Sequence, residues 1–459
     1  MFSVSSLLVL GLSAVAQAKV QFLGIAIAGG DIGCIIDGSC NLGQVEMPLS
    51  TLGGADGLGQ MKHFVNDDGL NLFRLPTSWQ YLINSEESAS SVLDEGNAAN
   101  YDQLVQACLS TGAYCMIDVH NFARFNGAVI GQGGPSDELF AGLWAALATK
   151  YAKEEKIIFE VTNEPHDLDI GLWVKTCQKV VTAIRKAGAS SQMILLPGDN
   201  FDSAATLVSS GSADGLLSIT NPDGSTDNLL LDIHKYLDVN NSGTLASCNT
   251  DNVGNFTALA SYLREQGRQG LISETGASPQ AQECFPAFCA QNTAINKNSD
   301  VFVGLVTWAA GSFGTDYVLT LTPTIDGNGN YVDNELMTEC VLGPYGGSPS
   351  KTTKSATTAK KTSTAKPVAS SSEPVSVSPS VSASSSSAKT SSSSSSSSSE
   401  SACSSAYRRV SSSSAMSSGL PRSHCMRGPA NPTSTPNAAG VVRAASNLAV
   451  AIAVGVALL

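Results

Sequence analysis

Short apolar runs rich in β-forming residues recur along residues 19–345, and segments with apolar residues at helical spacing lie between them. In Ile170–Lys186 the apolar residues recur every three or four positions, which is the period of an amphipathic helix. Similar patterns predict helices over Asn100–Ser110 and Glu138–Tyr151, and a shorter one over Ala258–Gln266. The predicted strands are Phe22–Ile27, Leu70–Leu75, Tyr114–Val119, Ile157–Val161, Met193–Leu196, Leu229–Ile233, Gly270–Ser273 and Phe302–Val306.

Eight such strands alternating with helices predict one α/β domain, a (β/α)8 TIM barrel, over residues 19–345. The runs are apolar throughout because both faces of a parallel strand are covered by other parts of the protein. No Gly-x-Gly-x-x-Gly sequence follows the first strand, which argues against a dinucleotide-binding fold.

Two glutamates stand where predicted strands end: Glu164 follows the fourth strand and Glu274 follows the seventh. In an α/β barrel the chemistry takes place at this end of the strands. Two carboxyl groups brought to one rim can act as acid/base and nucleophile in glycoside cleavage, although either glutamate alone is equally well explained as a solvated strand end. Further polar or aromatic residues at strand ends favour a shared site, and these are Arg74, His120, Asn163, His234, Tyr236 and Trp308.

The two ends of the chain carry targeting patterns. Residues 1–18 hold an apolar stretch followed by Ala16-Gln17-Ala18, which predicts a signal peptide and hence secretion. Residues 346–437 are rich in Ser and Thr and predict a disordered, O-glycosylated stalk. Residues 438–459 end in an apolar tail too short to span a bilayer, which predicts a removed GPI-type signal with Asn437 as the attachment point. We therefore expect an enzyme tethered at the cell surface or cell wall.

The charge distribution excludes several partners. Of the 26 Lys and Arg residues 11 lie after residue 345, but only two of the 39 Asp and Glu residues do, so the predicted domain has 15 basic and 37 acidic residues. This strong negative charge argues against nucleic acid and anionic membranes as partners, so that a membrane is expected only through the lipid anchor. It fits a neutral substrate.

Nine cysteines precede residue 346, and the predicted signal peptide permits disulfides. No Cys-x-x-Cys pair is present, which argues against zinc-binding and thioredoxin-like motifs. Asn240 and Asn255 occupy Asn-x-Ser/Thr sequences and are predicted glycosylation sites. Spacing favours the local pairs Cys34–Cys40 and Cys108–Cys115, leaves the pairing of Cys248, Cys284, Cys289 and Cys340 open, and makes Cys177 the odd cysteine.

Six ordered segments carry a resemblance to a known family. They are Phe73-Arg74-Leu75-Pro76, Asp118 to Arg124, Thr162-Asn163-Glu164-Pro165, Asp232 to Asp238, Ser273-Glu274-Thr275-Gly276 and Thr307-Trp308. In these segments, and over nearly all of residues 20–345, the sequence resembles glycoside hydrolase family 5, particularly secreted fungal endo-β-1,4-glucanases (cellulases).

The resemblance implies a role for each matching residue. Glu164 matches the general acid/base and Glu274 the nucleophile of a retaining endo-β-1,4-glucanase that cleaves cellulose or related β-glucans by double displacement. The other matches are Arg74 beside the nucleophile, Asn163 at the sugar 2-hydroxyl, His120, His234 and Tyr236 around the cleaved-bond subsite, and Trp308 under the sugar. The implied disulfides are Cys34–Cys40, Cys108–Cys115, Cys248–Cys284 and Cys289–Cys340, with Cys177 free.

The expected partner is a β-glucan polysaccharide or oligosaccharide, with no cofactor, no metal and a monomeric protein. The same mechanism acting on β-1,3/1,4-glucan, xyloglucan or mannan is the first alternative, because a tethered enzyme meets its own cell wall first. A non-catalytic wall-binding surface protein is the second alternative, and the presence of both glutamates argues against it.

Overall fold

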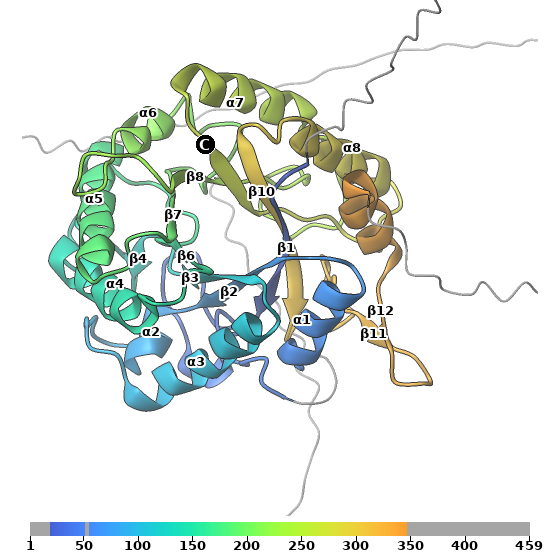
Figure 1. Ribbon diagram of the computed structural model, residues 1–459, viewed down its shortest axis with the longest axis horizontal. Helices are drawn as coiled ribbons and strands as arrows, with labels where there is room; N and C mark the ends of the chain where they lie inside the picture. Colours follow the sequence, from blue (N-terminus) through green and yellow to red (C-terminus); the bar gives the residue numbers. More distant parts are fainter. Residues whose placement is uncertain (1–18, 51–54, 347–459) are drawn as a thin grey trace, which may run out of the picture. The chain divides into compact units, whose positions relative to one another are not determined.

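The computed structural model describes residues 19–50 and 55–346, and in this part of the chain eight parallel strands close into a barrel. The strands follow one another around the barrel in chain order, and the last of them pairs with the first to close it (Figure 1). Their bounds are β1 Phe22–Ala28, β2 Leu72–Thr77, β3 Tyr114–Val119, β6 Ile157–Glu160, β7 Met193–Leu196, β8 Leu229–His234, β9 Gly270–Glu274 and β10 Phe302–Gly311. The predicted (β/α)8 barrel is confirmed, with each predicted strand in place.

The alternation of side chains along each strand separates two apolar layers. Phe73 packs outward among residues of the helices, whereas its neighbour Leu72 and Met116 of the next strand belong to a cluster inside the barrel. Two residues further along, the same inward row carries Arg74 and Asp118. The pleat therefore places charged side chains directly above an apolar plug, which consists of Phe22, Leu72, Met116, Ile158, Leu195, Leu230, Leu271, Val303 and Val306.

Helices surround the strands (Figure 1). The helix α5 has the predicted bounds, α4 begins at Asp137 and not at Glu138, α3 begins at Glu95 and not at Asn100, and α7 is longer than predicted. Side-chain oxygens of Asp94, Ser136 and Asp169 accept backbone N–H groups at the starts of α3, α4 and α5 and so fix where these helices begin. The α-helices are α1 Gly57–Asn66, α2 Trp79–Ile83, α3 Glu95–Ser110, α4 Asp137–Tyr151, α5 Ile170–Lys186, α6 Ser212–Leu217, α7 Val253–Gln266 and α8 Cys284–Lys297.

Smaller elements and disulfides complete the described part of the chain. Two short hairpins pair β4 (Arg124–Phe125) with β5 (Ala128–Val129) and β11 (Thr324–Ile325) with β12 (Tyr331–Val332). A 3-10 turn η1 (Leu42–Gln44) precedes α1, and η2 (Met337–Leu342) and η3 (Gly343–Tyr345) are the last elements of the described residues. The disulfides are Cys34–Cys40, Cys108–Cys115, Cys248–Cys284 and Cys289–Cys340, and Cys177 is free and buried. These are the four pairs that the family resemblance implies.

The predictions for the two chain ends mostly concern residues that the structure does not describe. The signal peptide, almost all of the stalk and the anchor signal lie outside the described residues. Within residues 19–50 and 55–346 no helix is long and apolar enough to cross a membrane. Of the two predicted glycosylation sites, Asn240 is exposed in a loop, whereas Asn255 lies in the first turn of α7 and donates its side-chain amide to Asn252.

Candidate active site

The predicted site residues gather at the carboxyl end of the barrel. Arg74 lies in β2, His120 directly follows β3, and Asn163 and Glu164 follow β6. His234 and Glu274 are the last residues of β8 and β9. Tyr236 follows β8 by two residues, and Trp308 lies within β10. The structure therefore brings together side chains from six strands on one rim.

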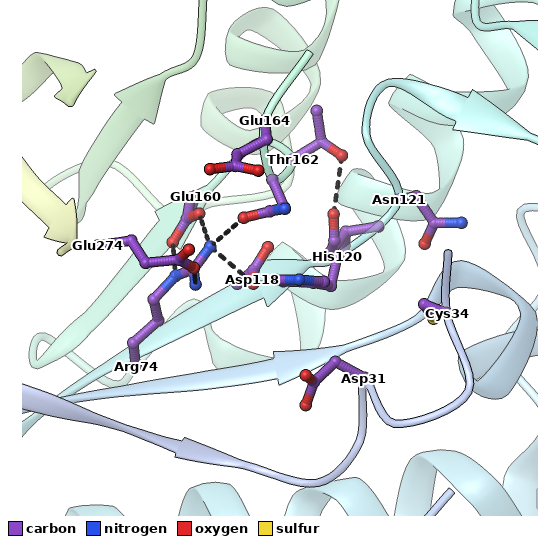
Figure 2. Close-up of polar contacts among 12 residues, drawn as sticks. Asp31, Cys34, Arg74, Asp118, His120, Asn121, Glu160, Thr162, Glu164 and Glu274 are labelled. Atoms are coloured by element: carbon purple, nitrogen blue, oxygen red, sulfur yellow. Dashed lines mark hydrogen bonds and ion pairs between the residues drawn. The ribbon is translucent and has the colours of Figure 1, made fainter. Parts of the chain in front are cut away.

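Arg74 is the hub of this cluster, and its side chain is fully buried. Its Nε donates to Glu160 Oε2 at 2.7 Å, and its Nη2 donates to Asn163 Oδ1 at 2.8 Å and lies 2.9 Å from Asp118 Oδ2. Nη1 donates to Glu274 Oε2 (Figure 2). One guanidinium group thus joins carboxylates from β3, β6 and β9, and only arginine offers enough donors in a fixed fork to do so.

Glu274 is held in its ionised form. In addition to Arg74, the Tyr236 hydroxyl donates to Glu274 Oε1 at 2.7 Å. Burial alone would raise the pKa of Glu274, but the charge of Arg74 first, and then His120 and the Tyr236 hydrogen bond, outweigh it and hold that pKa below its usual value. A buried carboxylate in this state is available as a nucleophile.

Glu164 has the opposite environment. Burial first, and the charge of Glu274 second, raise the pKa of Glu164 well above its usual value. Its Oε1 lies 2.9 Å from Nδ1 of His234, and burial lowers the pKa of His234 to about 3, so this imidazole is neutral. The backbone N–H of Glu164 donates to Asp202 Oδ2 at 3.1 Å, and this contact supports a positive φ of 41° at Glu164. Glu164 therefore keeps its proton to a higher pH than an ordinary glutamate does.

The two glutamates are close to one another. An oxygen of Glu164, an oxygen of Glu274 and a ring nitrogen of His234 all lie within 4.8 Å of one another. When two carboxyl groups are about 5 Å apart, no water molecule fits between one of them and the sugar. A separation of roughly 6.5–9.5 Å leaves room for that water molecule. The spacing and the two protonation states fit a proton donor and a nucleophile that act on the same bond.

Aromatic residues form one wall of the site. Trp308 is stacked against His120, with ring centroids 5.7 Å apart and an interplanar angle of 17°. The Trp308 Nε1 donates to the Tyr317 hydroxyl at 3.0 Å, and Tyr317 in turn stacks on Phe313. His120 Nδ1 lies 2.7 Å from Asp118 Oδ2; burial opposes charging of the ring, but Asp118 outweighs it and raises the pKa of His120.

Three acidic residues were not among the predicted site residues. Asp118 and Glu160 contact Arg74 directly, and Asp202 holds the backbone of Glu164. Glu160 could have been predicted from the sequence, because a charged residue inside an apolar strand is buried and needs a partner of opposite charge. Asp202 could not have been predicted, since it lies in a long stretch without clear periodicity after the predicted strand Met193–Leu196.

Two donor groups at this rim have the spacing of metal ligands, namely Glu164/His234/Glu274 and Glu160/Asp232/His234. Their carboxylates already have protein partners. Glu160 and Glu274 contact Arg74, and Asp232 Oδ1 accepts from the Ser273 hydroxyl. The rim is thus organised around a guanidinium group as its central cation.

Comparison with known proteins agrees with this geometry. Residues 38–313 match the family model described as cellulase (glycosyl hydrolase family 5). The chain is 51% identical to endoglucanase EG-II of Hypocrea jecorina over 330 residues, covering 71% of this chain and 78% of that protein. It is 45% identical to endoglucanase 1 of Saitozyma flava over 314 residues, covering 68% and 86%.

A solved structure, that of Cel5A (EG2) from Hypocrea jecorina, superimposes with a TM-score of 0.68 at 50% sequence identity. The superposition covers 70% of this chain and 98% of that one. Fold, rim chemistry and sequence therefore lead to one conclusion: the chain belongs to glycosyl hydrolase family 5 and is a glycoside hydrolase.

Proposed function

We propose that this protein is an endo-β-1,4-glucanase that cleaves internal bonds of cellulose or a related β-glucan with net retention. The observation that carries the proposal is the pairing of a high-pKa Glu164 with an ionised Glu274 whose oxygens lie within 4.8 Å. The names of the similar fungal proteins, which are endoglucanases, support the choice of substrate.

In the first step Glu164 donates its proton to the glycosidic oxygen while Glu274 attacks the anomeric carbon. The bond between that carbon and the glycosidic oxygen breaks, the reducing-end sugar leaves as an alcohol, and a glycosyl ester forms on Glu274. Asn163 accepts from Arg74 through Oδ1, and this orients its NH2 group to donate to the sugar 2-hydroxyl. Trp308 and its aromatic neighbours offer a flat apolar surface to the C–H face of the sugar.

In the second step water hydrolyses the glycosyl ester on Glu274. Formation of the ester removes the negative charge of Glu274, which is the second cause of the high pKa of Glu164. That pKa then falls, and Glu164 accepts a proton from water as the water attacks the anomeric carbon. The anomeric configuration is inverted twice, so the product keeps the β-configuration of the substrate.

Azide rescue tests the two roles separately. In Glu274→Ala, added azide should attack from the face that the carboxylate used and give an α-glycosyl azide. In Glu164→Ala, azide should attack the glycosyl ester and give the β-product. Glu155→Ala removes an exposed glutamate far from the rim and serves as the control. Azide products of the opposite configuration would mean that the two roles must be assigned the other way round. For the unmodified enzyme, a freshly formed α-hemiacetal in proton NMR would contradict retention.

The polymer is tested by a substrate panel. Initial rates of reducing-sugar release should be higher on soluble cellulose than on β-1,3/1,4-glucan, xyloglucan or mannan. A higher rate on one of the other three polymers would favour that polymer as the substrate. The four disulfides agree with an oxidising, extracellular place of action. Attachment through a lipid anchor is tested by release of the protein from cells with a phosphatidylinositol-specific phospholipase.

A further inference from the structure

A second group of ligand-type side chains lies at the C-terminal end of α1. His63 occupies the last turn of α1, Asp68 follows the helix in the loop toward β2, and Asp333 directly follows β12. Since α1 runs back from the end of β1 to the start of β2, its last turn lies away from the catalytic rim. Figure 1 shows the β11–β12 hairpin beside α1, and Tyr331 of this hairpin donates its hydroxyl to Asp56 at the start of the helix.

The donor atoms of this group converge. His63 Nε2 lies 3.1 Å from Asp333 Oδ1 and 3.5 Å from Asp68 Oδ2. On the other side of the ring, His63 Nδ1 lies 2.7 Å from Asp67 Oδ2. The side chains of His63, Asp68 and Asp333 are only 5%, 1% and 6% exposed. One nitrogen and two carboxylate oxygens therefore face a common, nearly dry point.

The partners of Asp68 are incomplete. Its Oδ2 is buried and has no hydrogen-bond partner within the described residues. One N–H on His63 Nε2 can serve only one acceptor well, and Asp333 is the nearer. Among those same residues Asp68 and Asp333 form ion pairs with His63 alone, and neither pairs with a lysine or an arginine. Asp68 is thus a buried carboxylate that lies near a second carboxylate and has one unsatisfied oxygen. Such an arrangement is unfavourable unless a further cation binds there.

We propose that His63 Nε2, Asp68 and Asp333 bind a divalent transition-metal ion such as Zn²⁺. Ligands held about 2.1 Å from a tetrahedral ion are about 3.4 Å apart. His63 Nε2 lies 3.5 Å and 3.1 Å from the oxygens of Asp68 and Asp333, and all three donor atoms lie within 4.8 Å of one another. The contact of Nδ1 with Asp67 is the carboxylate–histidine arrangement that orients a metal-binding imidazole through its other nitrogen. One imidazole and two carboxylates suit Zn²⁺ or Mn²⁺ better than Ca²⁺, which takes six to eight oxygens.

The ion would act as a clamp and would take no part in the glycosidic chemistry. Its ligands come from α1, from the loop before β2 and from the segment after β12, so a bound ion ties the C-terminal part of the domain to the first helix. An ion that binds only the folded chain stabilises it by mass action. We therefore expect an effect on stability and none on turnover.

The test compares metal binding and thermal unfolding of the full chain with those of Asp68→Asn and Asp333→Asn. After treatment with a chelator, the unmodified protein should bind one Zn²⁺ per chain in calorimetry that both variants fail to bind. At a free concentration about 100-fold above Kd, its Tm should rise by about 4 °C, and that of the variants should not. Asp227→Asn, which changes an exposed aspartate elsewhere, should behave as the unmodified protein. Activity on soluble cellulose verifies that each variant is folded.

Two results would overturn the proposal. One is the absence of Zn²⁺ binding to the unmodified protein, with Mn²⁺ also failing. The other is binding that persists in both variants, because such an ion must sit elsewhere in the chain; inhibition of activity by that ion would locate it at Glu164, His234 and Glu274.

Discussion

Replacement Tyr236→Phe removes one hydroxyl group and, with it, the 2.7 Å hydrogen bond to Glu274 Oε1. Tyr236 is 3% exposed and Glu274 is 5% exposed, so water is a poor substitute for the lost donor. A hydrogen bond to a charged group contributes about 1.5–3 kcal/mol, and one pKa unit corresponds to about 1.4 kcal/mol. The pKa of Glu274 should therefore rise by about 1–2 units.

The direction of the change in the pH profile follows from the proposed role of Glu274. The nucleophile must be ionised, so activity is lost as the pH falls through the pKa of Glu274 in the free enzyme. Raising that pKa moves the acid limb of the kcat/KM profile upward by about 1–2 pH units. The basic limb, which reports the proton on Glu164, should move much less because Tyr236 makes no hydrogen bond to Glu164.

The assay is kcat/KM on a soluble cello-oligosaccharide from about pH 3 to about pH 8. Tyr317→Phe is the matched control, since it removes a tyrosine hydroxyl from the same wall that contacts Trp308 and neither glutamate. Its acid limb should stay in place. An acid limb that moves by less than about 0.3 pH unit in Tyr236→Phe would refute the assignment of Glu274 as the group held ionised by this bond.

Three further outcomes are expected. Glu164→Gln should lower kcat by about 10²–10⁴ on cello-oligosaccharides, yet a dinitrophenyl cellobioside should still release its phenol in a burst, because that leaving group needs no proton; equal losses on both substrates would contradict the acid role. Loss of the Cys289–Cys340 disulfide, which joins residues 51 apart, should lower the free energy of unfolding by about 4 kcal/mol in urea titrations. The buried neutral His234 has a pKa of about 3 against 6.5 when unfolded, so its stabilising effect is present above pH 6.5 and is lost as the pH falls toward 3. The free energy of unfolding in urea should therefore fall less between pH 6.5 and pH 3 in His234→Gln than in the unmodified protein.

The parts of the fold that the sequence revealed are those with a simple period. The strands are continuous apolar runs, and α5 has apolar residues on one face only, so both patterns can be recognised without tertiary information. The helix α8 was missed because its buried face carries Gln291, Asn292 and Asn296. These amides bind Thr275, the Cys340 carbonyl and the Pro344 carbonyl, partners that are distant in sequence. The amides interrupt the apolar row of Phe285, Phe288 and Ile295, so the hydrophobic period of this helix is weak.

The same limit applies to the rim. Residues such as Arg74 and Glu274 stand at the ends of recognisable strands, so the register of the barrel brings them together. Asp202 and the cluster around His63 depend on loops whose paths are set by packing, and no local pattern predicts them. The electrostatic state of each glutamate is also a property of the assembled rim, because both have the same intrinsic acidity.

In the proposed mechanism, the different roles of the two glutamates follow from which of them Arg74 contacts. The inward layer above the apolar plug holds one guanidinium group and several carboxylates, so some carboxyls are neutralised by Arg74 and others only by a proton. Glu274 receives an N–H from Arg74 and an O–H from Tyr236 and stays charged. Glu164 receives neither; it faces a neutral His234 and the negative charge of Glu274, and it keeps its proton. The pleat of β2, which turns Arg74 toward β9, therefore determines which glutamate is ionised and which one keeps a proton.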